Sequence, residues 1–185
     1  NTTASNNVAI GADSMLLNTT GSQNTAVGAF ALDANTDGHS NAALGRSSLS
    51  ANTSGTNNTV VGANALDANT TRHDNVAIGY RALTNQSIAD QNTAIGSNSM
   101  AANQTGEYNV AVGYDSLVSN TTADNNIAIG RKALELNTTG TENTAVGAGA
   151  LDANTTGSYN TGVGYLSLTS NTTGTNNAAF GRKAL

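Results

Sequence analysis

The side chains that most often carry out chemistry are sparse in this sequence. Among 185 residues there are two histidines, twelve acidic residues, seven basic residues and no cysteine. The lack of cysteine excludes a disulfide framework and any thiolate metal or redox site. No serine, histidine and aspartate recur together in phase, and neither a phosphate-binding loop nor a dinucleotide-binding fingerprint is present. We therefore expect no enzymatic activity and no cofactor.

The best candidates for metal binding also fail on spacing. His39 and His73 occupy the same position of the repeat described below, two repeats apart. If each repeat is one coil of a stack, about 10 Å separates them, which is too far for one metal ion. The segment from Asp33 to Gly38 resembles the opening of a calcium loop, but the glutamate required at loop position 12 falls on Leu44. We interpret all of these as turn residues and expect no metal site.

The composition excludes further classes of protein. Ala, Asn, Thr and Gly supply 105 of the 185 residues, whereas Leu, Ile, Val and Phe supply only 32. An ordinary globular enzyme needs a larger stock of big apolar residues. The formal net charge of −5 excludes an electrostatic nucleic-acid binder. No apolar run approaches the roughly 18 residues of a membrane-spanning helix, so we expect no membrane insertion by this segment.

The few apolar residues recur at fixed positions of an exact internal repeat. A glycine, here called the repeat glycine, recurs every 17 residues from Gly11 to Gly181, in eleven copies without insertion or deletion. Alanine or serine always lies three residues after it, and leucine or methionine four residues after it. A disordered polar chain would not keep this phase, so we interpret residues 1–185 as a single repeat array.

Two asparagines belong to the repeat. The first, four residues before each repeat glycine, is invariant; the second, seven residues after it, is replaced only once, by Gln86. We call these the strand asparagines and the turn asparagines, and we expect both to bond amide to amide along the stack. Asn98 belongs to neither row, so we expect it to tolerate replacement. The strand asparagines are Asn7, Asn24, Asn41, Asn58, Asn75, Asn92, Asn109, Asn126, Asn143, Asn160 and Asn177.

A repeat of 17 residues favours one architecture. Repeats built from pairs of helices need 30 residues or more. Here each unit joins a Val- or Ile-centred strand segment to an Asn-Thr-Thr-Gly turn segment. The sequence therefore predicts an all-β protein, a parallel β-solenoid of eleven coils. Stacked about 4.8 Å apart, these coils make a rod on the order of 50 Å long.

Alternation along the strand predicts which side chains point inward. The residue before each repeat glycine is always large and apolar, so we expect it to face the coil interior. The residue two before the glycine then faces outward, and it is alanine in nine copies and never polar. An apolar outward row needs a covering layer. We therefore expect a homo-oligomer of parallel rods with cyclic symmetry, in contact through this alanine row.

The strand segments also resemble those of a known family. Asn7 to Gly11 and Asn75 to Gly79 both read Asn-Val-Ala-Ile-Gly, and Asn109 to Gly113 reads Asn-Val-Ala-Val-Gly. They resemble the head repeats of YadA-like trimeric autotransporter adhesins. The fuller unit from Asn143 to Gly157 is similar to repeats of phage and bacterial tail-fibre-like proteins. The resemblance implies a homotrimer of left-handed parallel β-rolls in a fibre on a cell or virion surface.

We therefore expect a structural or adhesive fibre segment, either the shaft or head of a surface adhesin or part of a phage tail fibre. Neither end shows an atypical capping repeat, so we expect a window of a longer fibre. A host-cell receptor or matrix is the expected partner, since Tyr and Arg are common in binding hot spots. The candidate contact residues are Tyr80, Tyr114, Arg131 and Tyr165.

Two other functions remain open at this stage. One is a self-assembling extracellular filament, formed by rods that stack end to end. The other is an ice-binding solenoid, suggested by the regular threonine row that includes Thr19, Thr36, Thr53 and Thr70. Such a solenoid needs a flat, outward threonine lattice borne on strands, whereas these threonines lie next to a glycine in a turn segment.

Overall fold

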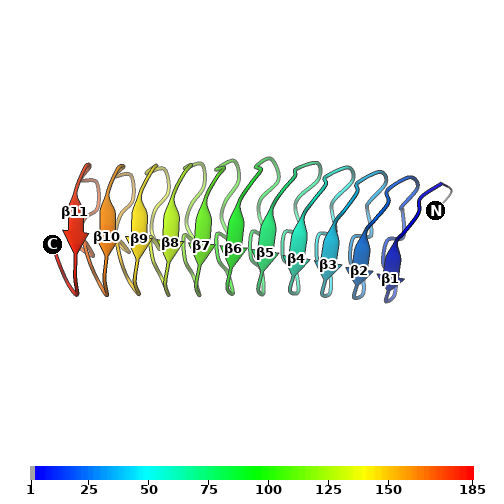
Figure 1. Ribbon diagram of the computed structural model, residues 1–185, viewed down its shortest axis with the longest axis horizontal. Helices are drawn as coiled ribbons and strands as arrows, with labels where there is room; N and C mark the ends of the chain where they lie inside the picture. The colour runs from blue at the N-terminus through cyan, green and yellow to red at the C-terminus, as the bar shows by residue number, and fades with distance from the viewer. Residues whose placement is uncertain (1–2) are drawn as a thin grey trace.

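A computed structural model describes residues 3–185, and it is a parallel β-solenoid with one short strand in each coil (Figure 1). The strands form a single eleven-stranded sheet in chain order, and no helix occurs in residues 3–185. The predicted all-β solenoid with 17-residue coils is confirmed. The strands are β1 (Val8–Ile10), β2 (Thr25–Val27), β3 (Ala42–Leu44), β4 (Thr59–Val61), β5 (Val76–Ile78), β6 (Thr93–Ile95), β7 (Val110–Val112), β8 (Ile127–Ile129), β9 (Thr144–Val146), β10 (Thr161–Val163) and β11 (Ala178–Phe180).

Every strand pairs in parallel with the next one, and each residue lies beside its own counterpart in the neighbouring coil. Ala94 in β6 pairs with Ala111 in β7, and Ala111 pairs with Ala128 in β8. The hydrogen bonds continue beyond the strands. Leu117 N–H, for example, donates to the Ala133 carbonyl across 3.0 Å. The unchanging repeat length therefore serves a hydrogen-bonded stack along the whole coil.

The direction of the strand side chains is the reverse of our prediction. The alanine row is the buried one: Ala26, Ala94 and Ala145 are fully buried, whereas Ile95 is 36% exposed and Ile10 is 59% exposed. The interior of the coil is narrow, because the repeat leucines fill it from the opposite side. At Gly162, a Cβ would already lie 3.3 Å from Leu151 Cγ and 3.0 Å from Ser167 Oγ. A methyl group fits this position, and in most coils the interior has no room for a larger side chain.

Each coil holds its shape through four residues with positive φ. They are the repeat glycine, the residue five before it, and the residues two and four after it. The last of these is the buried leucine, with φ of 49° at Leu117 and 53° at Leu83. A non-glycine residue in this conformation costs roughly 1–2 kcal/mol, so the packing and hydrogen bonds of the stack must outweigh that strain.

Asn98 was expected to be a neutral position, and the structure contradicts this. Asn98 has φ of 55°, a conformation that Asn tolerates better than Ala. Its Nδ2 also donates to Asp115 Oδ1 across 3.1 Å. Asn98→Ala would therefore lose a favoured backbone conformation and a hydrogen bond, so we expect it to lower the stability of the rod.

The first prediction compares two glycines that differ in their surroundings. Gly113 has φ of 139°, and a Cβ there would lie 2.5 Å from the Gly130 carbonyl oxygen. Gly113→Ala should therefore prevent folding or lower the melting temperature severely. Gly162→Ala restores the residue found in most coils and should leave the melting temperature unchanged or slightly raised. Circular dichroism melts check both variants, and similar melting temperatures for the two would contradict this account of coil stacking.

Candidate assembly surface

The strand asparagines form a continuous ladder, in which a bond to the backbone is added to the amide to amide bond expected from sequence. Asn92 Oδ1 accepts the backbone N–H of Asn109 across 3.0 Å, and Asn92 N–H donates to Asn75 Oδ1 across 3.0 Å. The same side chain to backbone bond joins all ten neighbouring pairs from Asn7 to Asn177. Direct amide to amide bonds of 2.9–3.3 Å accompany it in most pairs. The row therefore ties each strand entry to the backbone of the next coil.

The turn asparagines make a second ladder that meets the first at a shared acceptor. Asn35 Nδ2 donates to Asn18 Oδ1 across 2.8 Å and also to the Gly38 carbonyl across 3.1 Å. The same Gly38 carbonyl accepts Asn24 Nδ2 across 2.8 Å. One backbone oxygen in the turn thus receives one amide from each row. The two ladders form a connected network, and Asn24 and Asn35 are both fully buried.

The second ladder is interrupted at its one substitution. Gln86 Nε2 donates to the Ala89 carbonyl across 2.8 Å instead of reaching back to the previous coil. Asn69 Oδ1 is consequently buried with no hydrogen-bond partner. Gln86 Oε1 accepts Nδ2 of Asn92 and of Asn103. The strand ladder keeps the bond from Asn92 N–H to Asn75 Oδ1 but lacks the amide to amide bond there, so the interruption reaches both ladders.

The second prediction tests the first ladder at Asn92. Asn92→Ala removes the acceptor for Asn109 N–H and the donor to the Gly106 carbonyl, both of them in a buried network. We expect a loss of about 1–3 kcal/mol per chain, seen as a lower melting temperature. Thr122→Ala is the matched control, because Thr122 is exposed and has no positive φ. Equal melting temperatures for the two variants would mean that the ladder adds nothing to stability.

The third prediction concerns the interrupted ladder. Gln86→Asn restores the residue present in the other copies and supplies Asn69 Oδ1 with a donor. A buried acceptor without a partner costs about 1–3 kcal/mol, so this substitution should raise the melting temperature. Asn103→Gln should have the opposite effect, since it creates the same gap one coil further along. A Gln86→Asn variant less stable than the parent would contradict this explanation.

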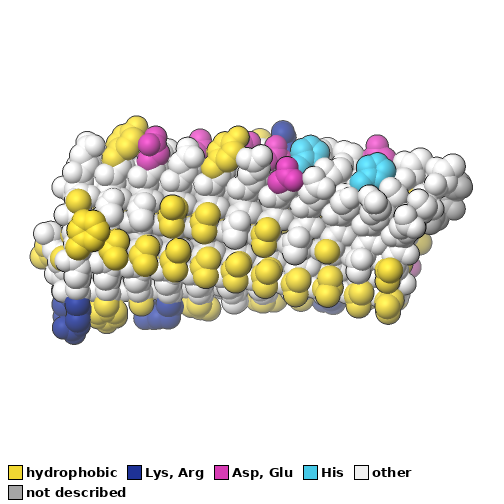
Figure 2. Space-filling view, viewed as in Figure 1, with side chains coloured by type: hydrophobic (Ala, Val, Ile, Leu, Met, Phe, Trp, Pro, Cys, Tyr) yellow, Lys and Arg dark blue, Asp and Glu magenta, His cyan; other side chains and the backbone are white. Residues whose placement is uncertain are grey.

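The outer side of the sheet is an exposed apolar surface that the sequence analysis did not foresee. It is formed by the residues one and three before each repeat glycine, and we call it the outer face. Figure 2 shows its apolar side chains as rows along the rod. Apolar patches of this length are not typical of monomers and mark contact sites. Its most exposed large residues are Val8, Ile10, Leu44, Val61, Ile95, Ile127, Ile129 and Phe180.

The side chains that could carry out chemistry instead make hydrogen bonds between neighbouring coils. His73 Nδ1 accepts the backbone N–H of Thr56 across 3.2 Å, and His39 Nδ1 accepts that of Ser22 across 3.0 Å. Asp90 Oδ1 accepts His73 N–H across 2.7 Å. Within residues 3–185 no three His, Asp or Glu side chains gather as a metal site, and this part of the chain has no pocket. It also contains no helix able to cross a membrane.

The four candidate receptor contacts lie along one edge of the sheet. Tyr80, Tyr114 and Tyr165 are each about half exposed, and Arg131 is exposed. Successive members are one or two coils apart and together span five coils, so they do not form one compact site. Arg182 lies over the Tyr165 ring, with its guanidinium carbon 5.7 Å from the ring centre.

The threonines considered for ice binding also make contacts along the rod. Thr36 Oγ1 donates to the Thr53 carbonyl across 3.1 Å, and Thr53 Oγ1 donates to the Thr70 carbonyl across 3.0 Å. The same bond recurs from Thr121 to Thr138 across 3.1 Å. These hydroxyl protons are therefore directed at the next coil rather than at solvent.

No protein-family model, curated protein or solved structure matches this chain.

Proposed function

We propose that this chain is a segment of an extracellular structural or adhesive fibre, and that three copies assemble as parallel rods through the outer face. The observation that carries the proposal is the outer face itself, whose row directly before the repeat glycine is apolar in all eleven coils. Water would otherwise cover two rows of Val, Ile, Thr and Ala along the length of the rod. The number of copies rests on the resemblance to trimeric adhesin heads.

The energetics support burial of this face. Covering the exposed part of one Val or Ile side chain is worth roughly 1 kcal/mol. The row directly before the repeat glycine holds Val or Ile in nine coils and Leu44 or Phe180 in the other two. Even partial coverage of this row therefore sums to a sizeable fraction of the stability of a typical domain, which is about 5–15 kcal/mol. The alanine row cannot play this part, because it lies inside the coil.

The uniformity of the coils supports a mechanical role. Residues 3–185 present a repeating surface without a pocket, and most coils contact the next through the same bonds. Such a rod provides length and stiffness at a constant rise per coil, as a fibre segment requires. For an adhesive fibre, the proposal also includes attachment to a host surface.

The fourth prediction tests assembly through the outer face. Ile95→Lys should dissociate the parent oligomer, because a charge would be buried between chains without a partner. Thr122→Lys is the matched control, since Thr122 is exposed in a turn away from the outer face. Light scattering after size exclusion should report three chains for the parent and the control, and fewer for Ile95→Lys. A parent that is a stable, folded monomer would overturn the proposal.

A further inference from the structure

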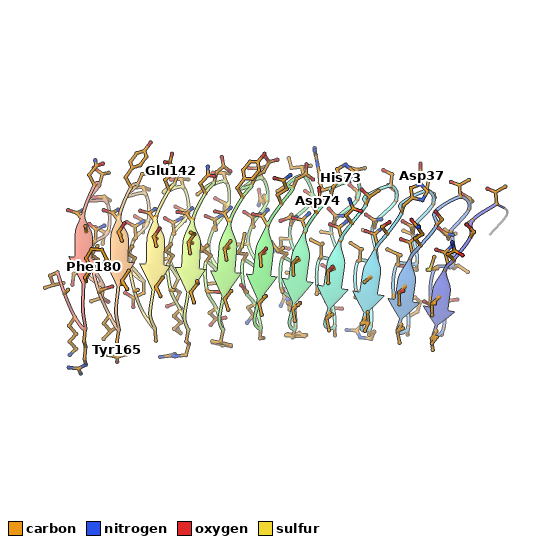
Figure 3. All side chains as sticks on the ribbon, viewed as in Figure 1. Asp37, His73, Asp74, Glu142, Tyr165 and Phe180 are labelled. Carbon is orange, nitrogen blue, oxygen red and sulfur yellow. The ribbon has the colours of Figure 1, made fainter. Side chains whose placement is uncertain are left out.

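Two long edges border the outer face, and they differ in chemistry. The leading edge consists of the residues five and six before each repeat glycine, and the trailing edge of the residues one and two after it. In Figure 2, most of the visible Asp, Glu and His side chains lie along one edge and most of the visible Lys and Arg side chains along the opposite one. Figure 3 places His73, Asp74 and Glu142 on the leading edge and Tyr165 on the trailing edge.

The two edges differ in the sign of most of their charges. The trailing edge carries two acidic residues, Asp13 and Asp115, and six of the seven basic residues: Arg46, Arg81, Arg131, Lys132, Arg182 and Lys183. The leading edge carries no basic residue and five acidic ones: Asp74, Asp90, Glu107, Asp124 and Glu142. The strand and its flanking residues lie between the edges, so these charges cannot pair within one chain.

Some of these charges are already balanced locally. Lys132 Nζ lies 2.7 Å from Glu135 Oε1, and this hydrogen bond raises the pKa of Lys132. The carboxylate of Asp115 acts on the Lys132 pKa in the same direction. Beside the leading edge, Arg72, which lies seven residues before Gly79, is 3.7 Å from Asp90. Among the described residues, Arg81 and Arg131 have no ion pair of their own, and neither does Asp124.

The edges match in four of the eleven coils. Four of the five tyrosines occur in two coils: Tyr108 and Tyr114 flank β7, and Tyr159 and Tyr165 flank β10. All four are about half exposed.

Charged residues follow the same pattern as these tyrosines. Asp74 and Arg81 flank β5, and Asp124 and Arg131 flank β8. The members of each pair share a coil without touching each other, so they lie at nearly the same height on opposite edges of the rod.

We propose that the trailing edge of one copy packs against the leading edge of the next, with tyrosine on tyrosine and Arg131 on Asp124. A symmetry axis along the rod keeps each residue at its own height, so every coil meets the same coil of its neighbour. It also turns the basic edge of each copy toward the acidic edge of the next. Antiparallel rods related by a two-fold axis along the strands would instead bring two acidic edges together.

This inference rests on the proposed assembly through the outer face and adds its orientation and axial register. It also gives Tyr114, Tyr165 and Arg131 a different partner from the receptor expected from sequence. Tyrosine pairs bury a large apolar area at low entropic loss. Opposite charges at such an edge determine partner orientation more than affinity.

The fifth prediction uses cross-linking, since the chain has no cysteine of its own. The double variant Tyr108→Cys with Tyr114→Cys, treated with a short bismaleimide, should give covalent species that stop at the closed oligomer. Each single variant should stay uncross-linked, because like edges do not meet. Tyr159→Cys with Tyr165→Cys is a second pair that should behave in the same way if the first one impairs assembly.

A charge exchange provides the second arm of this test. Arg131→Glu should weaken assembly at least tenfold, and adding Asp124→Lys in the same chain should recover most of the loss. Neither position has a positive φ, so backbone strain does not complicate the comparison. Asp124→Asn keeps the acceptor for Glu107 N–H and removes only the charge, so it should weaken assembly without lowering coil stability.

The outcomes separate this inference from the proposed function. If the parent has the mass of an oligomer but both double-cysteine variants stay uncross-linked, the edge pairing is wrong and assembly through the outer face still stands. Cross-linking of single variants as strong as that of the doubles would place like edges together and overturn the parallel arrangement. A monomeric parent would overturn both.

Discussion

The structure depends on a backbone carbonyl in each turn that accepts two buried asparagine amides. At Gly38 one amide comes from Asn24 and the other from Asn35, so a single oxygen joins the two sides of the coil. Each amide is fully satisfied only when the next coil lies in the same register, since Asn24 Oδ1 accepts Asn41 N–H. An inserted residue would leave buried polar groups unpaired on both sides, which explains the constant repeat length better than hydrophobic packing does.

The polar network also explains how a chain with few large apolar residues keeps a strained backbone. Leu117 and its counterparts have positive φ and are fully buried. Local preference opposes that conformation, and it persists because the surrounding contacts fix it. Each coil therefore stores strain that its neighbours compensate, so a single isolated coil is not expected to be stable.

The period and the strand class could be predicted from sequence, since they follow from the spacing and the residue types of the repeat. The inward direction of the alanine row could not, because both faces of the strand are apolar and we took the larger side chain to be the buried one. The width of the interior decides this, and it is set by Leu151 and its counterparts across the coil. The role of Asn98 could not be predicted for a similar reason. It depends on the positive φ at this position of the repeat, and the residue types found there in the other coils are too varied to indicate that conformation. The pairing of Tyr108 with Tyr114 is visible as a spacing, but only the fold places the two on opposite edges of one face.

The outer face and the two edges of the rod affect assembly in different ways. The inner rows and the outer face are nearly the same in every coil, so two rods in contact through the outer face alone would lose little by sliding one coil, about 4.8 Å. The edges vary from coil to coil: a shift by one coil would move Arg131 away from Asp124 and Tyr114 away from Tyr108. Uniform apolar contact thus favours association without fixing its register, and the varied edges penalise wrong registers. Sequence variation along the edges is therefore what allows a repetitive rod to assemble in one axial alignment.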